Sequence, residues 1–283
     1  MIVRETLTRA KSGRRFARPA VVGAVVLALL VVAAIAAPVL APHDPEAVQP
    51  SRVMGSPSAA YPFGSDVLGR DVLSRVLFAL RVSLAVAVAA VGAATLLAVP
   101  LGLVAGYAGG WVDTVISRPL DMLLVLPALL LAISLIAILG PGSMVASLAI
   151  AVIYLPILAR VMRTSTLVVS RSEYVTAARA RGAGHLRILL AHVLPNAVGP
   201  VAVQASVLTG FALQLEAALS FLGLGTQPPT PSLGGMLADG RDVLTQAPWV
   251  EVFPGLAIAV AVIAFTLLGD GLRRSLDPTG VAS

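Results

Sequence analysis

The chain has 283 residues and a net charge of +6; 58% of its residues are hydrophobic, another 25 are glycine, and only 12% are charged. Soluble domains are roughly 45–50% apolar, glycine included, and about 25% charged, so this composition excludes an ordinary soluble, disordered or fibrous protein. No cysteine is present, which excludes disulfides, thiolate metal sites and cysteine nucleophiles.

Six runs of the sequence are apolar enough to cross a membrane. A helix needs roughly 20 mostly apolar residues to span a bilayer core about 30 Å thick. The runs predict an all-α integral membrane protein with six transmembrane helices, at residues 20–41, 82–107, 120–139, 144–158 with an extension to 162, 197–224 and 252–268. Pro100, Pro127 and Pro156 lie inside these runs. We interpret them as kinks rather than helix ends, because neighbouring membrane helices can satisfy the backbone groups that proline frees.

The first run has a second interpretation as a cleaved signal peptide. A basic segment, residues 1–19, precedes it, and alanine-rich sequence near residues 34–37 suits a signal peptidase. We prefer a transmembrane helix at residues 20–41, because this run is longer than the roughly 7–15 apolar residues of a signal peptide.

The basic residues predict the orientation of the helices. Cytoplasmic loops retain an excess of lysine and arginine near the ends of membrane helices. With the N-terminus inside, fifteen of the twenty basic residues lie in inner segments. The sequence thus predicts a multi-pass protein of the cytoplasmic membrane, with cytoplasmic tails at residues 1–19 and 273–283. The positive charge reflects this topology rather than nucleic-acid binding.

Residues 42–80 differ from the apolar runs because prolines interrupt them among glycine, serine and aspartate. This composition predicts an irregular external loop. Toward its end, apolar residues recur at helical spacing, and Asp66 and Asp71 each precede an arginine by four residues, which supports a helix. We expect an interfacial helix over residues 70–81 that leads into the second span.

The longest inner loop, residues 163–196, carries the clearest local signals. Ser170 and Glu173 fit a capping box, in which a hydroxyl and a carboxylate satisfy backbone donors at a helix start. The short helix that begins there is expected to end at Gly182 and Gly184, since glycine accepts a positive φ.

A second short helix is expected from residue 185 to residue 194. Pro195 would stop it, and Asn196 is placed to cap the fifth transmembrane helix. Two short helices joined by a glycine turn and rich in arginine could lie on anionic lipid headgroups or dock onto another protein. The local sequence leaves both alternatives open.

The same loop resembles a known motif. EYVTAARARG at residues 173–182, followed by HVLPN at residues 192–196, is similar to the EAA loop of binding-protein-dependent ABC importer permeases. Further segments resemble the C-type permease subunit of the dipeptide, oligopeptide and nickel class. These segments are FGSD at residues 63–66, GRDVLSR at 69–75, RVSL at 81–84, AGYAGG at 105–110, EAALSFLGLG at 216–225 and QPPTPS at 227–232. The resemblance extends over nearly the whole chain.

The resemblance implies a type I ABC importer permease fold. A five-helix core would occupy residues 81–272, after the first transmembrane helix, and residues 163–196 would form a coupling loop that sits in a groove of a separate ATPase subunit. The residues assigned to this loop are Glu173, Tyr174, Ala177, Ala178, Arg179, Gly182, Arg187, His192 and Pro195. Three positions depart from the family pattern. Thr176 and His192 replace a glutamate and an isoleucine, and Leu233 replaces a common tryptophan, which predicts a weaker external contact.

The resemblance also implies the partners and the mechanism. The chain would pair with a homologous second permease subunit, two cytoplasmic ATPase subunits and an extracytoplasmic binding protein that delivers a dipeptide, an oligopeptide or a related small solute. Substrate would move by alternating access, and the chain itself would be no enzyme and would hold no cofactor. ATP and Mg²⁺ would belong to the ATPases. The single lysine, Lys11, agrees with this, because it follows an alanine and not the glycine of a P-loop.

Glu216 lies within the fifth apolar run, and an ionisable group at membrane depth is costly enough to be a site hypothesis. Two alternatives stay open: Glu216 is a gate or polar contact on the permeation path, or it is a buried carboxylate that holds helices together. Gln204 and Gln214 could line the same path. Glutamine also forms hydrogen bonds between membrane helices that are worth about 1 kcal/mol.

Two other functional classes compete with this interpretation. An ion- or proton-coupled secondary transporter would carry several buried acids or histidines as a relay, and only Glu216 is a convincing candidate. A membrane-embedded enzyme lacks support, because the apolar runs contain no histidine and no H-E-x-x-H motif occurs. A metal site at His43, beside Asp44 and Glu46, is not expected, because no second histidine lies in the outer segments.

Overall fold

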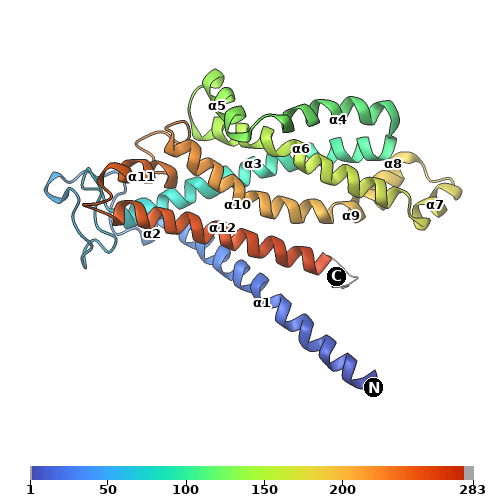
Figure 1. Ribbon diagram of the computed structural model, residues 1–283, viewed down its shortest axis with the longest axis horizontal. Helices are drawn as coiled ribbons and strands as arrows, with labels where there is room; N and C mark the ends of the chain where they lie inside the picture. The colour runs from blue at the N-terminus through green and yellow to red at the C-terminus, as the bar shows by residue number, and fades with distance from the viewer. Residues whose placement is uncertain (1, 277–283) are drawn as a thin grey trace. The chain divides into compact units, whose positions relative to one another are not determined.

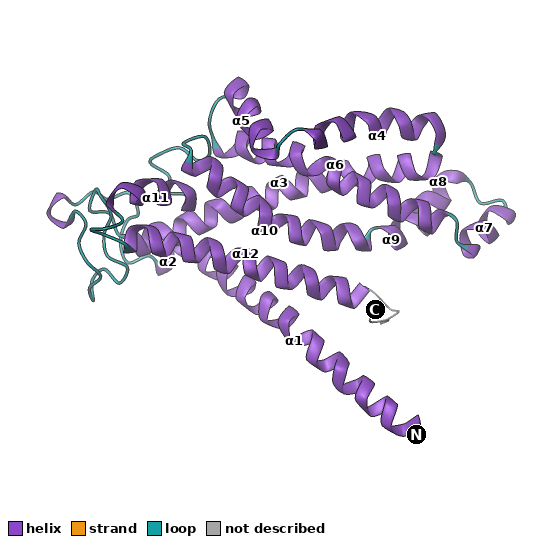
Figure 2. Ribbon diagram, viewed as in Figure 1, coloured by secondary structure: helices purple, strands orange, loops and turns teal. Residues whose placement is uncertain are grey.

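The computed structural model describes residues 2–276 of the protein, and these residues form helices joined by loops, with no β-strand among them (Figures 1 and 2). The longer helices are α1 (Ile2–Ile35), α3 (Val72–Ala108), α4 (Gly110–Val125), α5 (Ala128–Leu139), α6 (Ser143–Ser170), α10 (Gly199–Phe221) and α12 (Trp249–Leu276). The shorter ones are α2 (Ala37–Leu40), η1 (Pro50–Arg52), α7 (Glu173–Ala180), α8 (His185–Arg187), η2 (Ile188–Val193), α9 (Leu194–Ala197), α11 (Leu233–Gly240) and η3 (Arg241–Val243).

Four of the described helices are long and apolar enough to cross a membrane: α3, α6, α10 and α12. A fifth span exists if α4 and α5 are counted together, although they meet at a bend of 98°. The first predicted span corresponds to the shorter apolar stretch Pro19–Ile35 within α1. The chain is therefore a multi-pass membrane protein. The count of six spans stays a prediction.

The three prolines inside the apolar runs differ in their effect on the helices. Pro100 lies inside α3 and Pro156 inside α6, as the interpretation of kinks requires. Pro127 does not: α4 ends at Val125, and α5 begins after Pro127. Proline disfavours helical backbone at the residue before it, and Leu126 accordingly has an extended conformation, with φ −79° and ψ 133°. Pro127 therefore ends a helix, contrary to the prediction.

The expected interfacial helix over residues 70–81 is not a separate element, because α3 starts at Val72 and continues without a break to Ala108. Asp71 forms the N-terminal cap of this helix. Its Oδ2 accepts hydrogen bonds from the backbone N–H of Ser74 at 3.1 Å and from the Ser74 hydroxyl at 2.5 Å.

The described chain divides into two compact units. The first takes in the residues up to Leu84, Ser220–Leu222, and the residues from Pro228 onward. In this unit α12 packs against α1 and α11, and Figure 1 shows α1 and α12 side by side. Glycines permit the close approach of α1 and α12, because a Cβ at Gly23 would lie 2.7 Å from the Leu267 Cβ.

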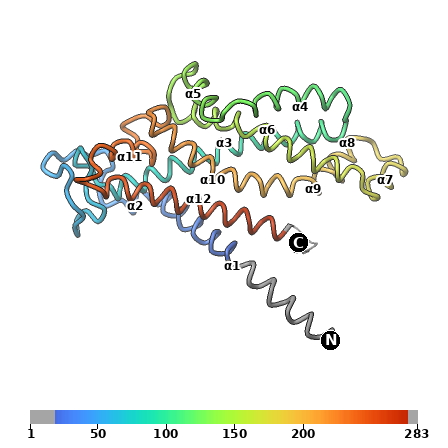
Figure 3. The backbone as a smooth tube through the Cα atoms, viewed as in Figure 1, coloured from blue at the N-terminus to red at the C-terminus, as the bar shows by residue number. Residues whose placement is uncertain are grey.

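The second unit comprises Ala85–Leu219 and Gly223–Gln227. In it α4 and α5 pack against α6, and the short helices α7 to α9 gather at the C-terminal end of α6 (Figure 3). Gly102 and Gly106 form a G-x-x-x-G pair on α3 that faces α6. A Cβ at Gly102 would lie 2.4 Å from the Ala159 carbonyl oxygen, and one at Gly106 would lie 2.6 Å from that of Arg163, so α6 can approach only glycine here.

Candidate functional site

The inner loop begins with α7, whose start differs from the predicted capping box. Ser170 is the last residue of α6, and Ser172 is the N-cap residue of α7. The hydroxyl of Ser172 donates to the Val169 carbonyl at 2.6 Å and does not cap α7. The predicted box with Glu173 is therefore wrong, because α6 extends further than the apolar run and occupies the serine that would have served as the cap.

The turn after α7 is a glycine-dependent helix end. Gly182 has φ +81°, its N–H donates to the Arg179 carbonyl at 2.9 Å, and the N–H of Ala183 donates to the Ala178 carbonyl at 3.1 Å. This pair of bonds defines a Schellman motif, in which the residue at the Gly182 position takes the left-handed conformation. The prediction for Gly182 is confirmed. Gly184 has φ −65° and needs no glycine-specific conformation.

The second half of the loop is not the single helix that the sequence predicts. A turn of π-helix, η2, lies between α8 and α9. Pro195 lies in the first turn of α9, where a missing N–H does no harm, so it does not stop the helix. The side chain of Asn196 donates to the His192 carbonyl at 2.8 Å, and α10 begins only at Gly199, so Asn196 does not cap it.

The loop has its own small core, formed by Val175, Ala178, Ile188 and Val193, which are all buried. Ala178, assigned to partner contact by resemblance, is thus turned inward and supports the loop from within. The other assigned residues are accessible. His192 is half-buried, and the exposed ones are Glu173, Tyr174, Ala177, Arg179, Gly182, Arg187 and Pro195.

Two exposed leucines on the same loop were not predicted from the sequence. Leu186 is 70% exposed and Leu190 is 51% exposed, and they are four residues apart. This spacing places apolar side chains on one helical face, which is the signal that could have identified them. Tyr174 on α7 is also exposed, at 45%, so the loop presents apolar side chains as well as arginines.

Tyr107, in the last turn of α3, links this helix to both halves of the loop. Its hydroxyl lies 2.9 Å from Nδ1 of His185, and the guanidinium of Arg179 lies 5.5 Å from the centre of the Tyr107 ring. The first contact is a hydrogen bond and the second a cation–π interaction. Tyr107 lies in the segment AGYAGG at residues 105–110, and no pattern in the sequence predicts a role for it.

Two ion pairs connect α4 to α6. Arg163 donates from Nε and Nη2 to the two carboxylate oxygens of Asp113, each at 2.5 Å. Such a bidentate pair fixes the distance and the orientation of the two helices. Arg160 donates from Nη2 to Oδ1 of Asp121, also at 2.5 Å, in a single contact.

A cavity of about 300 Å³ lies beside these pairs, between α3, α4 and α6. Its polar lining consists of Ser117, Asp121, Arg160, Arg163 and Thr164. Its apolar lining consists of Gly102, Ala105, Ile116, Leu120, Pro156 and Ala159.

The three residues predicted for the substrate path lie on α10 and do not line this cavity. Glu216 is fully buried, Gln204 is half-buried and Gln214 is exposed. They therefore do not form one polar surface within the second unit. Whether Glu216 gates the path or holds helices together stays a hypothesis.

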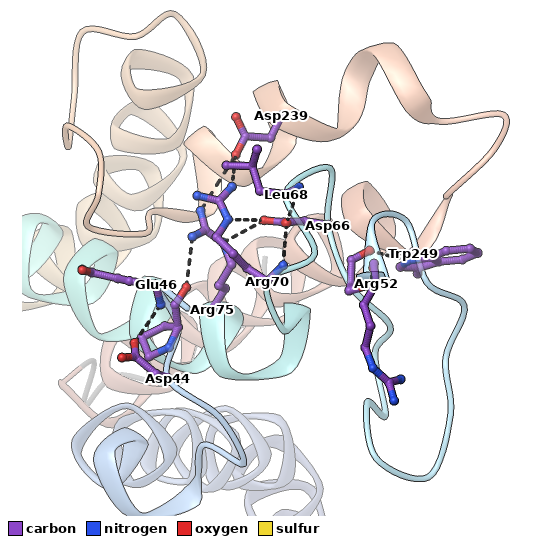
Figure 4. A network of polar contacts seen from close by, with 11 residues as sticks. Asp44, Glu46, Arg52, Asp66, Leu68, Arg70, Arg75, Asp239 and Trp249 are labelled. Atoms are coloured by element: carbon purple, nitrogen blue, oxygen red, sulfur yellow. Dashed lines mark hydrogen bonds and ion pairs between the residues drawn. The ribbon is translucent and has the colours of Figure 1, made fainter. Parts of the chain in front are cut away.

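The first unit contains a separate charge network, shown in Figure 4. Asp66 is buried, and its Oδ2 lies 2.6 Å from Nε of Arg70 and 3.4 Å from Nε of Arg75. Asp239 on α11 lies 3.2 Å from Nη2 of Arg70. The predicted pair of Asp66 and Arg70 thus exists, but in a loop, and Arg75 turns to Asp66 instead of Asp71.

The same unit fixes residues 42–71 to the start of α12. The indole N–H of Trp249 donates to the Ser65 carbonyl at 3.1 Å, and the rings of Phe63 and Phe253 stack with centroids 3.8 Å apart. The predicted irregular loop is therefore irregular in backbone but held by many specific contacts.

Comparisons with known proteins match most of this chain. The family described as binding-protein-dependent transport system inner membrane component matches residues 98–279. The family described as the N-terminal TM domain of oligopeptide transport permease C matches residues 14–57.

Individual relatives are similar over most of both chains. The dipeptide transport system permease protein DppC of Alkalihalophilus pseudofirmus is 42% identical over 92% of this chain and 85% of its own length. The glutathione transport system permease protein GsiD of Pectobacterium atrosepticum is 43% identical, over 94% and 89%. The di/tripeptide transport system permease protein DppC of Pseudomonas aeruginosa is 42% identical, over 90% and 86%. The chain therefore belongs to the binding-protein-dependent transport system inner membrane components, as a C-type permease subunit of an ABC importer.

Proposed function

We propose that this chain is one of two homologous permease subunits that import dipeptides, oligopeptides or a related small solute by alternating access. The names of the relatives support the substrate class, since they denote dipeptide, di/tripeptide and glutathione transport systems. The other partners in the proposal are two cytoplasmic ATPases, which use ATP and Mg²⁺, and an extracytoplasmic binding protein. In the proposed arrangement the chain lies in the cytoplasmic membrane, and both termini and the inner loop face the cytoplasm. The distribution of arginine supports this orientation.

The observation that carries the proposal is the inner loop itself. It is a compact pair of helical segments with a core of its own, a glycine-dependent turn and an exposed surface of apolar and basic side chains. A surface loop with this degree of internal order suits a rigid docking element better than a flexible connection. We assign its exposed face to a groove on an ATPase subunit.

The loop is joined to the transmembrane helices at points that can transmit movement. Two residues connect α6 to α7, η2 and α9 contact α6, and Tyr107 links α3 to Arg179 and His185. Closure of the ATPase pair on ATP would stabilise one position of the loop. The helices joined to it would then favour one of two access states, because the two states differ in their interaction energy with the partner.

The test is site-directed cross-linking in the assembled complex. The chain has no cysteine, so single cysteines can be introduced without background labelling of this subunit. Ala177→Cys lies on the exposed face of α7, and Ser58→Cys is the control in the exposed part of the external loop. We expect a short bifunctional reagent to join the first variant, and not the second, to the ATPase subunit. Equal cross-linking of both, or of neither, would contradict the proposed docking.

A further inference from the structure

The two ion pairs beside the cavity of the second unit differ in how open they are. In the bidentate pair, the side chains of Arg163 and Asp113 are 33% and 19% exposed. In the single-contact pair, those of Arg160 and Asp121 are 58% and 55% exposed. Asp121 and Arg160 lie at the ends of the predicted spans at residues 120–139 and 144–162, and Asp113 and Arg163 lie in the adjoining inner segments. Arg163 of the bidentate, closed pair and both members of the single-contact, open pair line the cavity.

Both members of the open pair retain hydrogen-bonding capacity. A guanidinium carries five N–H donors, and toward the described residues the Arg160 side chain donates through Nη2, to Asp121. Only Oδ1 of Asp121 takes part in that contact. A ligand that offers a carboxylate to Arg160 and an ammonium to Asp121 therefore satisfies both groups by replacing a single hydrogen bond.

The rest of the cavity suits a ligand with charged ends and a variable middle. The hydroxyls of Ser117 and Thr164 already donate within the chain, to Asp113 and to the Arg160 carbonyl, and their oxygens remain able to accept. Leu120 and the small residues on α3 and α6 give apolar walls without a shaped side-chain pocket. The volume of about 300 Å³ lies at the lower end of the roughly 300–1,000 Å³ of small-molecule sites.

We propose that this cavity is a subsite of the translocation path, in which Arg160 binds the carboxylate end of a short peptide and Asp121 binds its ammonium end. The proposal rests on the proposed function as a peptide importer. Peptides of different sequence share their two charged ends, so recognition of the ends admits many side chains. The bidentate pair of Arg163 and Asp113 holds α4 against α6 while the open pair exchanges partners.

The experiment measures protection of a cysteine by substrate. Ser117→Cys places a thiol in the cavity, and Thr114→Cys places one on α4 outside it. The complete complex is purified through a tag on the ATPase, which selects assembled variants, and is reconstituted in bilayers. A charged thiol reagent is added during turnover with ATP, binding protein and alanylalanine. We expect the dipeptide to slow labelling of Ser117→Cys roughly tenfold and to leave Thr114→Cys unchanged.

Neutral variants test the role of each charge. Arg160→Gln and Asp121→Asn should each abolish the protection of Ser117→Cys, because one charged end of the dipeptide loses its partner. Alanylalanine that is acetylated and amidated should not protect, since it has no charged ends. Protection that survives both substitutions, or that the blocked dipeptide also gives, would overturn the subsite.

Two further outcomes separate the alternatives. Labelling that depends on the phosphatidylethanolamine content of the bilayer, and not on the dipeptide, would assign the pair to a zwitterionic lipid headgroup and overturn the proposal. A complex that imports alanylalanine while Ser117→Cys labels at an unchanged rate would also overturn the subsite but leave the proposed function intact. A complex that imports no peptide at all would contradict the proposed function itself.

Discussion

Tyr107 lies on a transmembrane helix and contacts both halves of the inner loop. Its hydroxyl is hydrogen-bonded to His185, and its ring lies under the guanidinium of Arg179. A hydrogen bond contributes roughly 0.5–1.5 kcal/mol, and a cation–π contact at an exposed site contributes about 0.5–1 kcal/mol. Each contact is weak, but the two act through a single side chain, which makes Tyr107 a positioning residue for the loop.

We expect the two contacts to be separable by substitution. Tyr107→Phe removes the hydrogen bond to His185 and keeps the ring beneath Arg179, whereas Tyr107→Ala removes both contacts. The amount of peptide imported per ATP hydrolysed should therefore fall slightly in the first variant and several-fold in the second, as measured in proteoliposomes. If Tyr107→Ala keeps the wild-type ratio, Tyr107 does not transmit movement.

Residue spacing predicted some of the charge contacts and missed others. The spacing of four between Asp66 and Arg70 identified a real pair, although these residues lie in a loop. The same spacing failed for Asp71 and Arg75. Asp71 caps α3, and the Arg75 side chain reaches the buried Asp66 instead. Which carboxylate Arg75 reaches depends on where the fold places the loop. Residue spacing carries no information about that position.

At the scale of elements, the contact between α3 and α6 depends on glycine. A Cβ at Gly102 would lie 2.4 Å from a carbonyl oxygen of α6, closer than any real contact of that kind, and the obstacle is backbone. Membrane helices that approach closely use small residues in this way. The position bears on the proposed function because α3 carries Tyr107 and α6 carries both arginines that line the cavity.

We predict that Gly102→Leu separates α3 from α6. Gly92 on the same helix is the matched control, because a Cβ there would have no heavy atom within 4 Å. Both substitutions replace glycine with leucine on the same helix and improve helix propensity equally, by less than about 1 kcal/mol, so any difference between them reflects packing. Gly102→Leu should lower the thermal stability of the purified complex and reduce peptide uptake, whereas Gly92→Leu should do neither. The packing account is wrong if the two variants behave alike.

Hydropathy could predict where the elements lie better than where they end. The apolar runs located α3, α6, α10 and α12, because membrane insertion demands long apolar helices whatever their neighbours. The helix ends depended on local contacts. Pro127 ends α4 because it disfavours helical backbone at Leu126, and the turn of π-helix before Pro195 is followed by α9, which starts where a stop was expected. Neither outcome is encoded in average hydropathy.

At the scale of the whole molecule, the described chain supplies several helices apolar enough to span a membrane, and the sequence holds no ATP-binding motif. The family could be recognised from the sequence because its motifs are contiguous and occur in order, and the matches over residues 14–57 and 98–279 confirm this. The coupling role of the inner loop is implied by resemblance and stays a proposal. Its buried core, its Schellman turn and its contact with Tyr107 required the fold, since residues far apart in sequence form them.

The central claim is that the inner loop couples ATP hydrolysis in a partner to substrate movement through this chain. Gly182 offers the sharpest test, because its φ of +81° is needed for the turn while a Cβ there would meet no atom within 4 Å. Asparagine tolerates this left-handed conformation, whereas a β-branched residue does not. A substitution at this position therefore changes the turn without creating a clash.

The measurement is peptide import and ATP hydrolysis, determined together in proteoliposomes that contain the complete complex. We predict that Gly182→Asn imports peptide at close to the wild-type ratio to ATP hydrolysed. Gly182→Val should assemble and hydrolyse ATP but import peptide at less than about a tenth of that ratio, since left-handed backbone costs a β-branched residue more than 1 kcal/mol and the helices of the loop would separate. Wild-type import by Gly182→Val in an intact complex would contradict the claim.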